Sequence, residues 1–181
     1  LGEARAAAGL GVFLYEGTEV TGIEHGSRPV VATRQGRVTA DFVVLAGNAY
    51  HHLEPDRLSG LVFPSGTYIL ATEPLTEAEV AQINPLDLAV CDQNQVLDYF
   101  RLSADRRLLF GGGCNYSGRE PRSIERAMAP RLRRVYPQLA HKRIDYAWGG
   151  KVGVVVNRTP LLGRIGENIF YAQGYSGHGV S

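Results

Sequence analysis

Hydrophobic residues along the chain fall mostly in short runs separated by glycine, asparagine and charged residues, a pattern typical of strands joined by turns. The first nine residues differ: their alanine, arginine and glutamate favour a helix, which Gly9 or Gly11 is expected to end. The apolar runs that follow predict strands over 12–15, 20–24, 30–33 and 38–40. The last three indicate a small antiparallel meander.

The next run, from Asp41 to Ala46, is apolar at every position after Asp41. Such a run is typical of a strand buried on both faces, as in a parallel sheet. It leads into a turn of small residues at 47–50. From about Pro64 onward the apolar runs predict further strands over 67–72, 89–92, 96–103 and 107–111.

Two helices are predicted in this second part of the chain. Thr76 and Glu79 have the spacing of a capping box, which indicates a short helix to about residue 83. Ser123 is a candidate N-cap for a second helix, and Pro130 inside that helix is expected to kink or shorten it. One face of the second helix carries four apolar residues, Ile124, Met128, Leu132 and Val135.

The last part of the chain predicts strands over 144–148 and 152–156 around Gly149 and Gly150, then a hairpin of strands 161–165 and 169–173. There is no internal repeat and no low-complexity linker. The fold class is therefore α/β, with mixed α+β character. A middle segment, 68–146, is expected to be inserted between two parts, 1–67 and 147–181, that belong together.

Composition narrows the class of protein. The 181 residues are 44% hydrophobic and 20% charged, as in soluble globular proteins. The formal net charge is +1 without a basic run, so neither nucleic acid nor an anionic membrane is an expected partner. No apolar run reaches the length of a membrane span. Cys91 and Cys114 are isolated, which favours a cytoplasmic location and predicts no metal site.

The chain closes with three glycines among its last eight residues, from Gly174 to Ser181, directly after an apolar run. This predicts a strand, a glycine turn and the start of a helix, whose backbone amides are able to approach a flat or anionic ligand. An ordinary glycine turn is the competing interpretation. The given sequence begins with Leu1 rather than methionine, and no helix follows the closing turn, so both ends are expected to be internal to a larger protein.

Four segments occur in a definite order: Gly11 to Val20, Ala40 to Tyr50, Trp148 to Gly163 with its Asn-Arg-Thr-Pro, and the Gly-Tyr-Ser-Gly-His-Gly-Val ending. Together with Ala71 to Leu75 (Ala-Thr-Glu-Pro-Leu), they resemble the D-amino-acid-oxidase-like family of FAD-dependent oxidoreductases over essentially the whole chain. The likeness is greatest to the members that oxidise γ-glutamylputrescine. The family's N-terminal glycine fingerprint is absent, so the resemblance implies that it lies upstream.

The resemblance implies a non-covalently bound FAD, and an FAD-binding domain at 1–67 and 147–181. Backbone amides of the closing turn would stabilise negative charge at the flavin. Val20 is expected to meet the adenine, and the turn at Ala46 its ribose and pyrophosphate. The cofactor-binding residues carried over are Val20, Ala46, Gly47, Asn48, Gly150, Val152, Gly174, Tyr175, Ser176, Gly177, His178, Gly179 and Val180.

The middle segment 68–146 is expected to be the substrate domain, an antiparallel sheet. Val152 stands where amino-acid oxidases of the family have an arginine for the substrate carboxylate, which argues against an α-amino acid as substrate. Candidate catalytic residues are His178 and Lys151, although a solvated side chain is the favoured interpretation of Lys151 and His178 is not expected to be an obligate base. The candidate substrate-binding residues are Tyr68, Asp92, Tyr99, Arg101, Trp148 and Arg158, and Cys91 is a further pocket candidate.

The implied reaction is oxidation of the C–N bond of a primary amine such as γ-glutamylputrescine, giving an imine and then an aldehyde and ammonia. Oxygen is the expected electron acceptor, with peroxide as its product. Alternatives are a secondary-amine or amino-acid oxidase or dehydrogenase, like sarcosine and glycine oxidases, and a non-catalytic module. The chain alone is expected to be inactive, and to self-associate through exposed strand edges.

Overall fold

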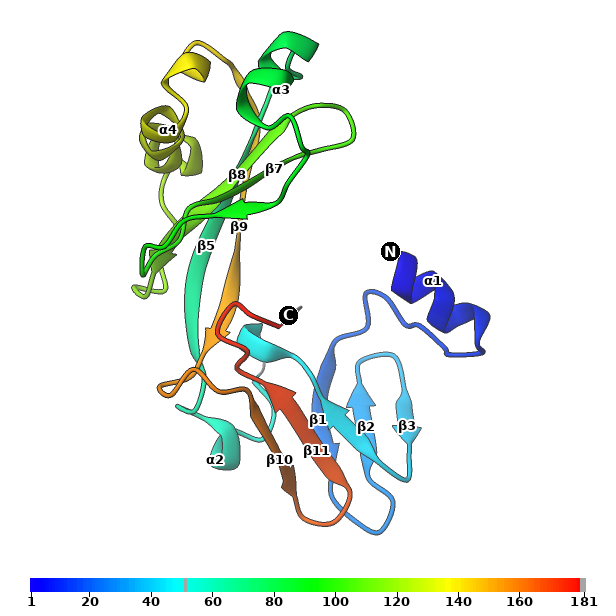
Figure 1. The fold of residues 1–181 in the computed structure, drawn as a ribbon. Helices are drawn as coiled ribbons and strands as arrows, with labels where there is room; N and C mark the ends of the chain where they lie inside the picture. The colour runs from blue at the N-terminus through cyan, green and yellow to red at the C-terminus, as the bar shows by residue number, and fades with distance from the viewer. Residues whose placement is uncertain (51, 180–181) are drawn as a thin grey trace. The chain divides into compact units, whose positions relative to one another are not determined.

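The computed structural model describes residues 1–50 and 52–179, which form two compact units (Figure 1). Unit 1 comprises residues 1–46, 52–59 and 162–172, and unit 2 comprises 47–50, 60–161 and 173–179. The predicted boundaries at 67/68 and 146/147 fall inside two strands of unit 2, and the assignment of the parts to cofactor and substrate stays a prediction.

Across the described ranges, no helix has both the length and the apolar character needed to cross a membrane.

Unit 1 contains two short helices and two three-stranded sheets. Strands β1, β2 and β3 form the predicted antiparallel meander, and β4 pairs in parallel with β11, with Phe170 opposite Val44. Strand β10 lies on the other side of β11. The elements are α1 (Gly2–Gly9), β1 (Val20–Glu24), β2 (Val30–Thr33), β3 (Arg37–Thr39), β4 (Val43–Leu45), α2 (Pro55–Leu58), β10 (Leu161–Ile165) and β11 (Ile169–Gln173).

One face of the β10–β11–β4 sheet is buried. Val43 and Leu45 alternate with the exposed Val44, and the buried pair packs with Leu58, Ile165 and Ile169. The expected strand at 41–46 and its parallel pairing are therefore present, but its burial on both faces is not. Only one apolar cluster lies against β4 within the described residues, so the alternate side chain points away from it.

Unit 2 is built on one antiparallel sheet in the order β6–β7–β8–β5–β9. Ser123 caps α4 by accepting a hydrogen bond from the N–H of Arg126, and the helix continues through Pro130, so Pro130 does not shorten it. The elements are η1 (Asn48–Tyr50), β5 (Phe63–Thr72), α3 (Glu77–Ile83), β6 (Val90–Cys91), β7 (Tyr99–Leu102), β8 (Leu108–Asn115), α4 (Ile124–Val135), η2 (Pro137–Leu139) and β9 (Ile144–Val154).

The two faces of this sheet differ. On one face Leu70 and Phe110 are fully buried against Met128 and Leu132 of α4, which gives unit 2 its core. The helix also carries Arg131, which donates a hydrogen bond at 2.7 Å to the buried carboxylate of Asp98. Because side chains alternate along a strand, neighbouring residues project to the opposite face, which α4 does not cover.

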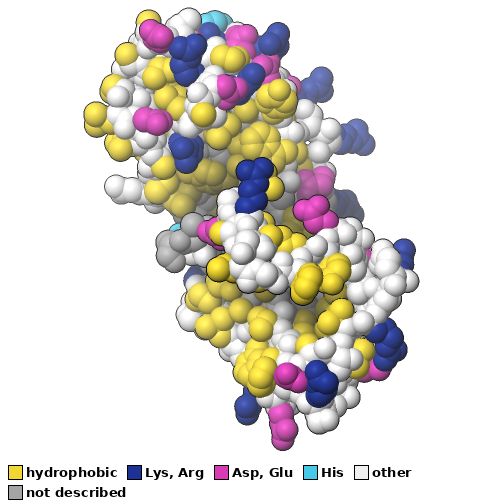
Figure 2. Space-filling view, turned by 90° about the vertical axis from the view of Figure 1, so that its right-hand side faces the viewer, with side chains coloured by type: hydrophobic (Ala, Val, Ile, Leu, Met, Phe, Trp, Pro, Cys, Tyr) yellow, Lys and Arg dark blue, Asp and Glu magenta, His cyan; other side chains and the backbone are white. Residues whose placement is uncertain are grey.

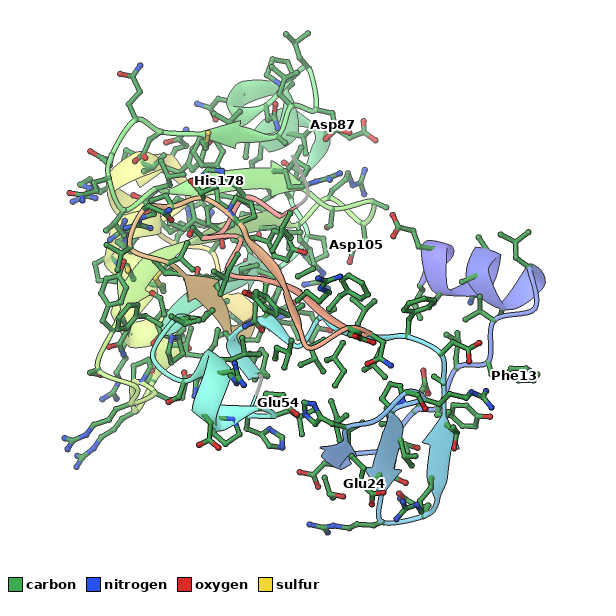
Figure 3. The ribbon with its side chains drawn as sticks, turned by 90° about the horizontal axis from the view of Figure 1, so that it is seen from below. Phe13, Glu24, Glu54, Asp87, Asp105 and His178 are labelled. Carbon is green, nitrogen blue, oxygen red and sulfur yellow. The ribbon has the colours of Figure 1, made fainter. Side chains whose placement is uncertain are left out.

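Two strand predictions are wrong: one predicted strand is absent, and two predicted strands are a single strand. Residues 12–15 form no strand, since no described segment pairs with them, and Phe13 is 83% exposed (Figure 3). Conversely, the two strands expected around Gly149 and Gly150 are one strand, β9. Its register with β5 runs without interruption from Ala71↔Tyr146 to Phe63↔Val154, so the ladder holds both glycines in extended geometry.

The helix α3 begins with the predicted capping box. The N–H and hydroxyl of Thr76 donate to Glu79 Oε2 at 2.8 and 2.9 Å, and Lys142 Nζ lies 2.9 Å from Oε1. Lys142 first, and then the Thr76 N–H, lower the pKa of Glu79 from 4.5 to about 2. A carboxyl whose pKa is lower in the folded state stabilises the fold above its unfolded pKa and loses that effect as it is protonated.

We therefore expect the free energy of unfolding of the wild-type chain to fall more steeply than that of Glu79→Gln as the pH drops from about 4.5 to about 2. Urea unfolding followed by circular dichroism across this pH range measures the difference. Glu77→Gln, at an exposed position of the same helical turn, is the matched control. Parallel pH profiles for the wild type and Glu79→Gln would contradict the expectation.

Candidate functional site

The two turns that the sequence singled out meet in unit 2. Asn48, at the start of η1, accepts a hydrogen bond on its Oδ1 from the backbone N–H of Gly174 at 2.9 Å. Gly174 directly follows the end of β11. The turn after β4 and the closing turn therefore lie side by side, as the cofactor hypothesis requires.

The closing turn is also fastened to β9. The N–H of Ser176 donates to the carbonyl of Gly153 at 2.8 Å, and the Ser176 hydroxyl oxygen accepts from the N–H of Val155 at 3.3 Å. Gly174 and Ser176 both have positive φ, +70° and +55°, so the chain turns sharply here. Three segments distant in sequence thus hold one another through backbone and short polar groups.

Small residues are required where these segments touch. A Cβ on Gly174 would lie 2.5 Å from Val155 Cγ1, and one on Gly153 would overlap the side-chain oxygen of Asn48. Both distances are far below ordinary van der Waals contact. These positions therefore require glycine because a Cβ would prevent the segments from approaching each other, and backbone flexibility alone does not explain the requirement.

The outer part of the closing turn presents backbone donors. Gly177 and Gly179 are exposed, and their N–H groups have no hydrogen-bond acceptor within the described residues. Gln173, just before the turn, is 1% exposed, and its Oε1 likewise has no partner there. An unpaired buried acceptor costs roughly 1–3 kcal/mol. The turn thus offers both donors and an acceptor to a bound group, which fits a polar, planar cofactor edge.

Strand β9 passes these turns with its middle residues. The N–H of Lys151 donates to the hydroxyl of Tyr50 at 2.7 Å, and this hydroxyl lies 3.6 Å from where a Cβ on Gly150 would be. Val152 pairs with Ser65 of β5, and its uncharged side chain provides no cation at this position of β9. Tyr50 is 63% exposed, yet its hydroxyl reaches β9 across 101 residues of sequence.

An apolar cavity of about 310 Å³ lies on the sheet face that α4 leaves uncovered. Side chains alternate along β7, and both Tyr99 and Arg101 line this cavity. The Tyr99 ring lies so closely over Gly111 that a Cβ there would overlap it. The lining comes from β5, β6, β7 and β8 and consists mainly of Ile69, Ala89, Val90, Cys91, Tyr99, Arg101 and Leu109.

Residues of β9 near the turns share a sheet face with the cavity. Trp148 stands directly opposite Ile69, and directly opposed residues project to the same face of a sheet. Farther along β5, Thr67 lies within 3.3 Å of the Tyr99 hydroxyl and stands opposite Gly150. A path of contacts therefore leads from Tyr99 through Thr67 to Gly150, where the Tyr50 hydroxyl lies.

Three substrate candidates lie elsewhere. Tyr68 is buried in the core on the opposite face, with its hydroxyl accepting from Asn115 at 3.1 Å, so it does not line the cavity. Asp92 is not a lining residue: partial desolvation raises its pKa, but donors of Asn94 outweigh this and the pKa is lowered overall. Arg158 is exposed in the loop after β9, at a φ of 62°.

The remaining candidates are placed as follows. Val20 begins β1 and Ala46 follows β4, both in unit 1, whereas Gly47 lies in unit 2. Tyr175 accepts a hydrogen bond on its carbonyl from the N–H of His178, which is exposed (Figure 3). Val180 lies outside the described residues. Within the described residues, no cluster of side chains has a metal-binding arrangement.

The lining residues Ile69 and Leu109 were not selected from the sequence. Both belong to predicted strands, and both alternate with core residues, Leu70 and Phe110. Alternation alone separates the two faces of each strand. The signal that joins the right faces across β5, β7 and β8 is the strand order, which the sequence did not supply.

The packing at Gly174 generates a stability test. We expect Gly174→Ala to lower the free energy of unfolding by roughly 2–5 kcal/mol. This combines about 1–2 for a left-handed alanine with about 1–3 for the overlap with Val155. Gly177→Ala, also at positive φ but with nothing within 4 Å of its Cβ, should lose only about 1–2 kcal/mol. Equal losses in urea unfolding would contradict the close approach.

Comparisons with known proteins agree with this geometry. The family described as "DAO: FAD dependent oxidoreductase" matches residues 1–181. The chain is 44% identical over 183 residues to the gamma-glutamylputrescine oxidoreductase of Escherichia coli (strain K12), covering 100% of the chain and 43% of that protein. It is 27% identical over 172 residues to sarcosine oxidase subunit beta of Rhodobacter capsulatus, covering 90% of the chain and 39% of that protein.

Among solved structures, glycine oxidase from Geobacillus kaustophilus superposes with a TM-score of 0.78 at 25% identity, over 96% of the chain and 46% of that structure. L-proline dehydrogenase from P. horikoshii also gives a TM-score of 0.78, at 21% identity, over 97% of the chain and 49% of that structure. The chain thus spans less than half the length of these relatives. With its full length matched, the chain belongs to the DAO family of FAD-dependent oxidoreductases.

Proposed function

We propose that this chain forms part of an FAD-dependent amine oxidoreductase that oxidises the C–N bond of a primary amine such as γ-glutamylputrescine. The observation that carries the proposal is the hydrogen bond from Gly174 to Asn48. This bond joins the glycine-rich closing turn to η1, and Ser176 bonds the same turn to β9, a strand of the sheet whose uncovered face holds the apolar cavity. Cofactor donors and a substrate surface are thus parts of one unit.

The closing turn would hold the flavin. The N–H groups of Gly177 and Gly179 are the donors for a negatively charged edge, and the Gln173 amide is a further polar group for the cofactor. When bound, FAD would supply the acceptor for the two electrons of the C–N bond. Donors fixed in advance need no rearrangement when charge develops, which is why a turn fastened at Asn48 and Gly153 suits this task.

The sheet face would bind the amine. Its cavity offers Ile69, Leu109 and the Tyr99 ring to an aliphatic stem, and Arg101 to a distal carboxylate. An apolar site favours the neutral form of an amine, which is the form that gives up electrons. The uncharged Val152 leaves β9 without a carboxylate anchor beside the turns, so a substrate whose carboxylate is distant from the reacting nitrogen fits better than glycine.

His178 and Lys151 have limited roles in this proposal. Lys151 is half-buried and contributes its backbone N–H to Tyr50, which orients the Tyr50 hydroxyl over Gly150. His178 lies on the exposed turn, where its backbone helps to close the bend. Neither side chain is needed as an obligate base if the cavity keeps the amine neutral.

The proposal is tested on protein expressed from the longest reading frame that contains these residues. We expect flavin absorbance in the purified protein, bleaching by γ-glutamylputrescine without oxygen, and peroxide formation when oxygen is admitted. Sarcosine and glycine are the comparison substrates. Faster bleaching by either would assign the protein to the secondary-amine or amino-acid oxidases, and a colourless protein that binds no added FAD would contradict the proposal altogether.

The role of Arg101 gives a sharper test. Loss of a charge-assisted hydrogen bond costs roughly 1.5–3 kcal/mol, so Arg101→Ala should raise the KM for γ-glutamylputrescine about tenfold to hundredfold. The KM for putrescine, which has no carboxylate, should remain unchanged. Arg133→Ala, at an exposed arginine of α4, is the matched control. An equal change for both substrates would refute a carboxylate contact at Arg101.

A further inference from the structure

The hydroxyl of Tyr99 is held at a defined point of the sheet face that α4 leaves uncovered. Tyr99 stands opposite Gly111 of β8, and a Cβ on Gly111 would lie 2.1 Å from Tyr99 Cε2. The side chain therefore extends over β8 towards β5, where its hydroxyl oxygen lies 3.3 Å from Thr67 Oγ1. Packing fixes the ring, and a polar contact fixes the hydroxyl.

The contact with Thr67 also sets the direction of the Tyr99 hydroxyl proton. Thr67 Oγ1 lies 3.3 Å from the carbonyl oxygen of Gly112, and a carbonyl only accepts, so the Thr67 hydroxyl donates to it. A threonine hydroxyl has a single proton, so Thr67 accepts in its contact with Tyr99. The phenol oxygen keeps its lone pairs for another donor, since no described residue donates to it.

The Tyr99 oxygen is the hydrogen-bond acceptor that the side chains of the apolar cavity offer. Among the described lining residues, Tyr99 alone carries a side-chain oxygen, whereas the guanidinium of Arg101 only donates. The other lining side chains are hydrocarbon, apart from the weakly accepting thiol of Cys91. Burying a ligand N–H here without an acceptor would be unfavourable. The cavity therefore favours a ligand that brings an N–H to the Tyr99 oxygen.

The place of this acceptor along the strands indicates which N–H it receives. The closing turn is bonded to β9 at Gly153 and Val155, whereas Thr67 stands opposite Gly150. Three residues of strand, from Gly150 to Gly153, span about 10 Å. In γ-glutamylputrescine four methylene groups separate the amide nitrogen from the reacting nitrogen, roughly 6 Å when extended. With the cofactor at the closing turn, the group that reaches Tyr99 is the amide.

We propose that the Tyr99 hydroxyl oxygen accepts a hydrogen bond from the amide N–H of the substrate, and that Thr67 is the residue that positions this hydroxyl. The inference rests on the amine oxidoreductase proposed above and narrows its substrate class to amides of a diamine, with the amide between the reacting amine and a distal carboxylate. Tyr99 would separate such amides from amines of the same length that have none. Thr67 acts only through Tyr99.

Tyr99→Phe is tested with two substrates, on protein expressed from the longest reading frame that contains these residues. One is γ-glutamylputrescine, and the other is the matching diaminodecanoic acid, in which two methylene groups replace the amide. Anaerobic flavin reduction gives a half-saturating concentration and a limiting rate for each. We expect Tyr99→Phe to raise the half-saturating concentration of γ-glutamylputrescine roughly tenfold at an unchanged limiting rate, and to leave both values for the diaminodecanoic acid unchanged. Tyr116→Phe, at an exposed tyrosine of the same unit, is the matched control.

Thr67 is tested with Thr67→Val, which keeps the shape of the side chain without the hydroxyl, and with Thr67→Ser, which keeps the hydroxyl. In Thr67→Val the Tyr99 proton is no longer directed away from the cavity, so we expect the half-saturating concentration of γ-glutamylputrescine to rise about threefold to tenfold. Thr67→Ser should behave as the wild type does. In the Tyr99→Phe background, Thr67→Val should add nothing. Circular dichroism and flavin content establish that each variant is folded.

Isothermal titration with γ-glutamylbutylamide, which has the amide but no reacting amine, separates this inference from the proposed function. Binding that Tyr99→Phe weakens roughly tenfold supports the amide contact even where no amine reduces the flavin, a result that would overturn the proposed function alone. Three results would overturn the contact while amine oxidation stands: no binding of the butylamide to the wild type, unchanged binding in Tyr99→Phe, or an equal loss for the two substrates.

Discussion

The hydrogen bond between the Gly174 N–H and the Asn48 side chain is the constraint on which the site depends. It joins segments 126 residues apart, at a place where a Cβ on either Gly174 or Gly153 would not fit. One main-chain donor and one short amide side chain therefore join the closing turn to η1, and Ser176 joins the same turn to β9. Without this contact, the hydrogen bonds of Ser176 to β9 would alone hold the turn, with the exposed amides of Gly177 and Gly179, against the sheet.

The two faces of the unit 2 sheet have different roles: one forms the core, and the other is the proposed binding surface. The face under α4 carries Leu70, Phe110 and the buried Tyr68, and it supplies the core. The other face keeps Tyr99, Arg101 and Trp148 at the surface beside a cavity. Figure 2 shows hydrophobic side chains (yellow) at the surface. In unit 2, Trp148 is one of the exposed hydrophobic residues, at 44% exposure. An uncovered apolar face is tolerable where a ligand is to be bound.

Local sequence patterns predicted most elements, and their failures have physical causes. The capping box at Thr76, the N-cap at Ser123 and the β1–β2–β3 meander depend on residues close together in the chain, so the sequence predicts them. Residues 12–15 have the composition of a strand but no pairing partner among the described residues. The glycines of β9 suggested a break, yet a long ladder with β5 keeps the strand continuous.

The sequence by itself determined the family, the kind of closing turn, and the face of β7 that carries Tyr99 and Arg101, because ordered motifs and a period of two are local properties. Only the tertiary structure decided that Tyr68 belongs to the core, that the Tyr50 hydroxyl reaches Lys151, and that Asn48 fastens Gly174. Each of these depends on strand order and on contacts between distant segments, which no local pattern specifies.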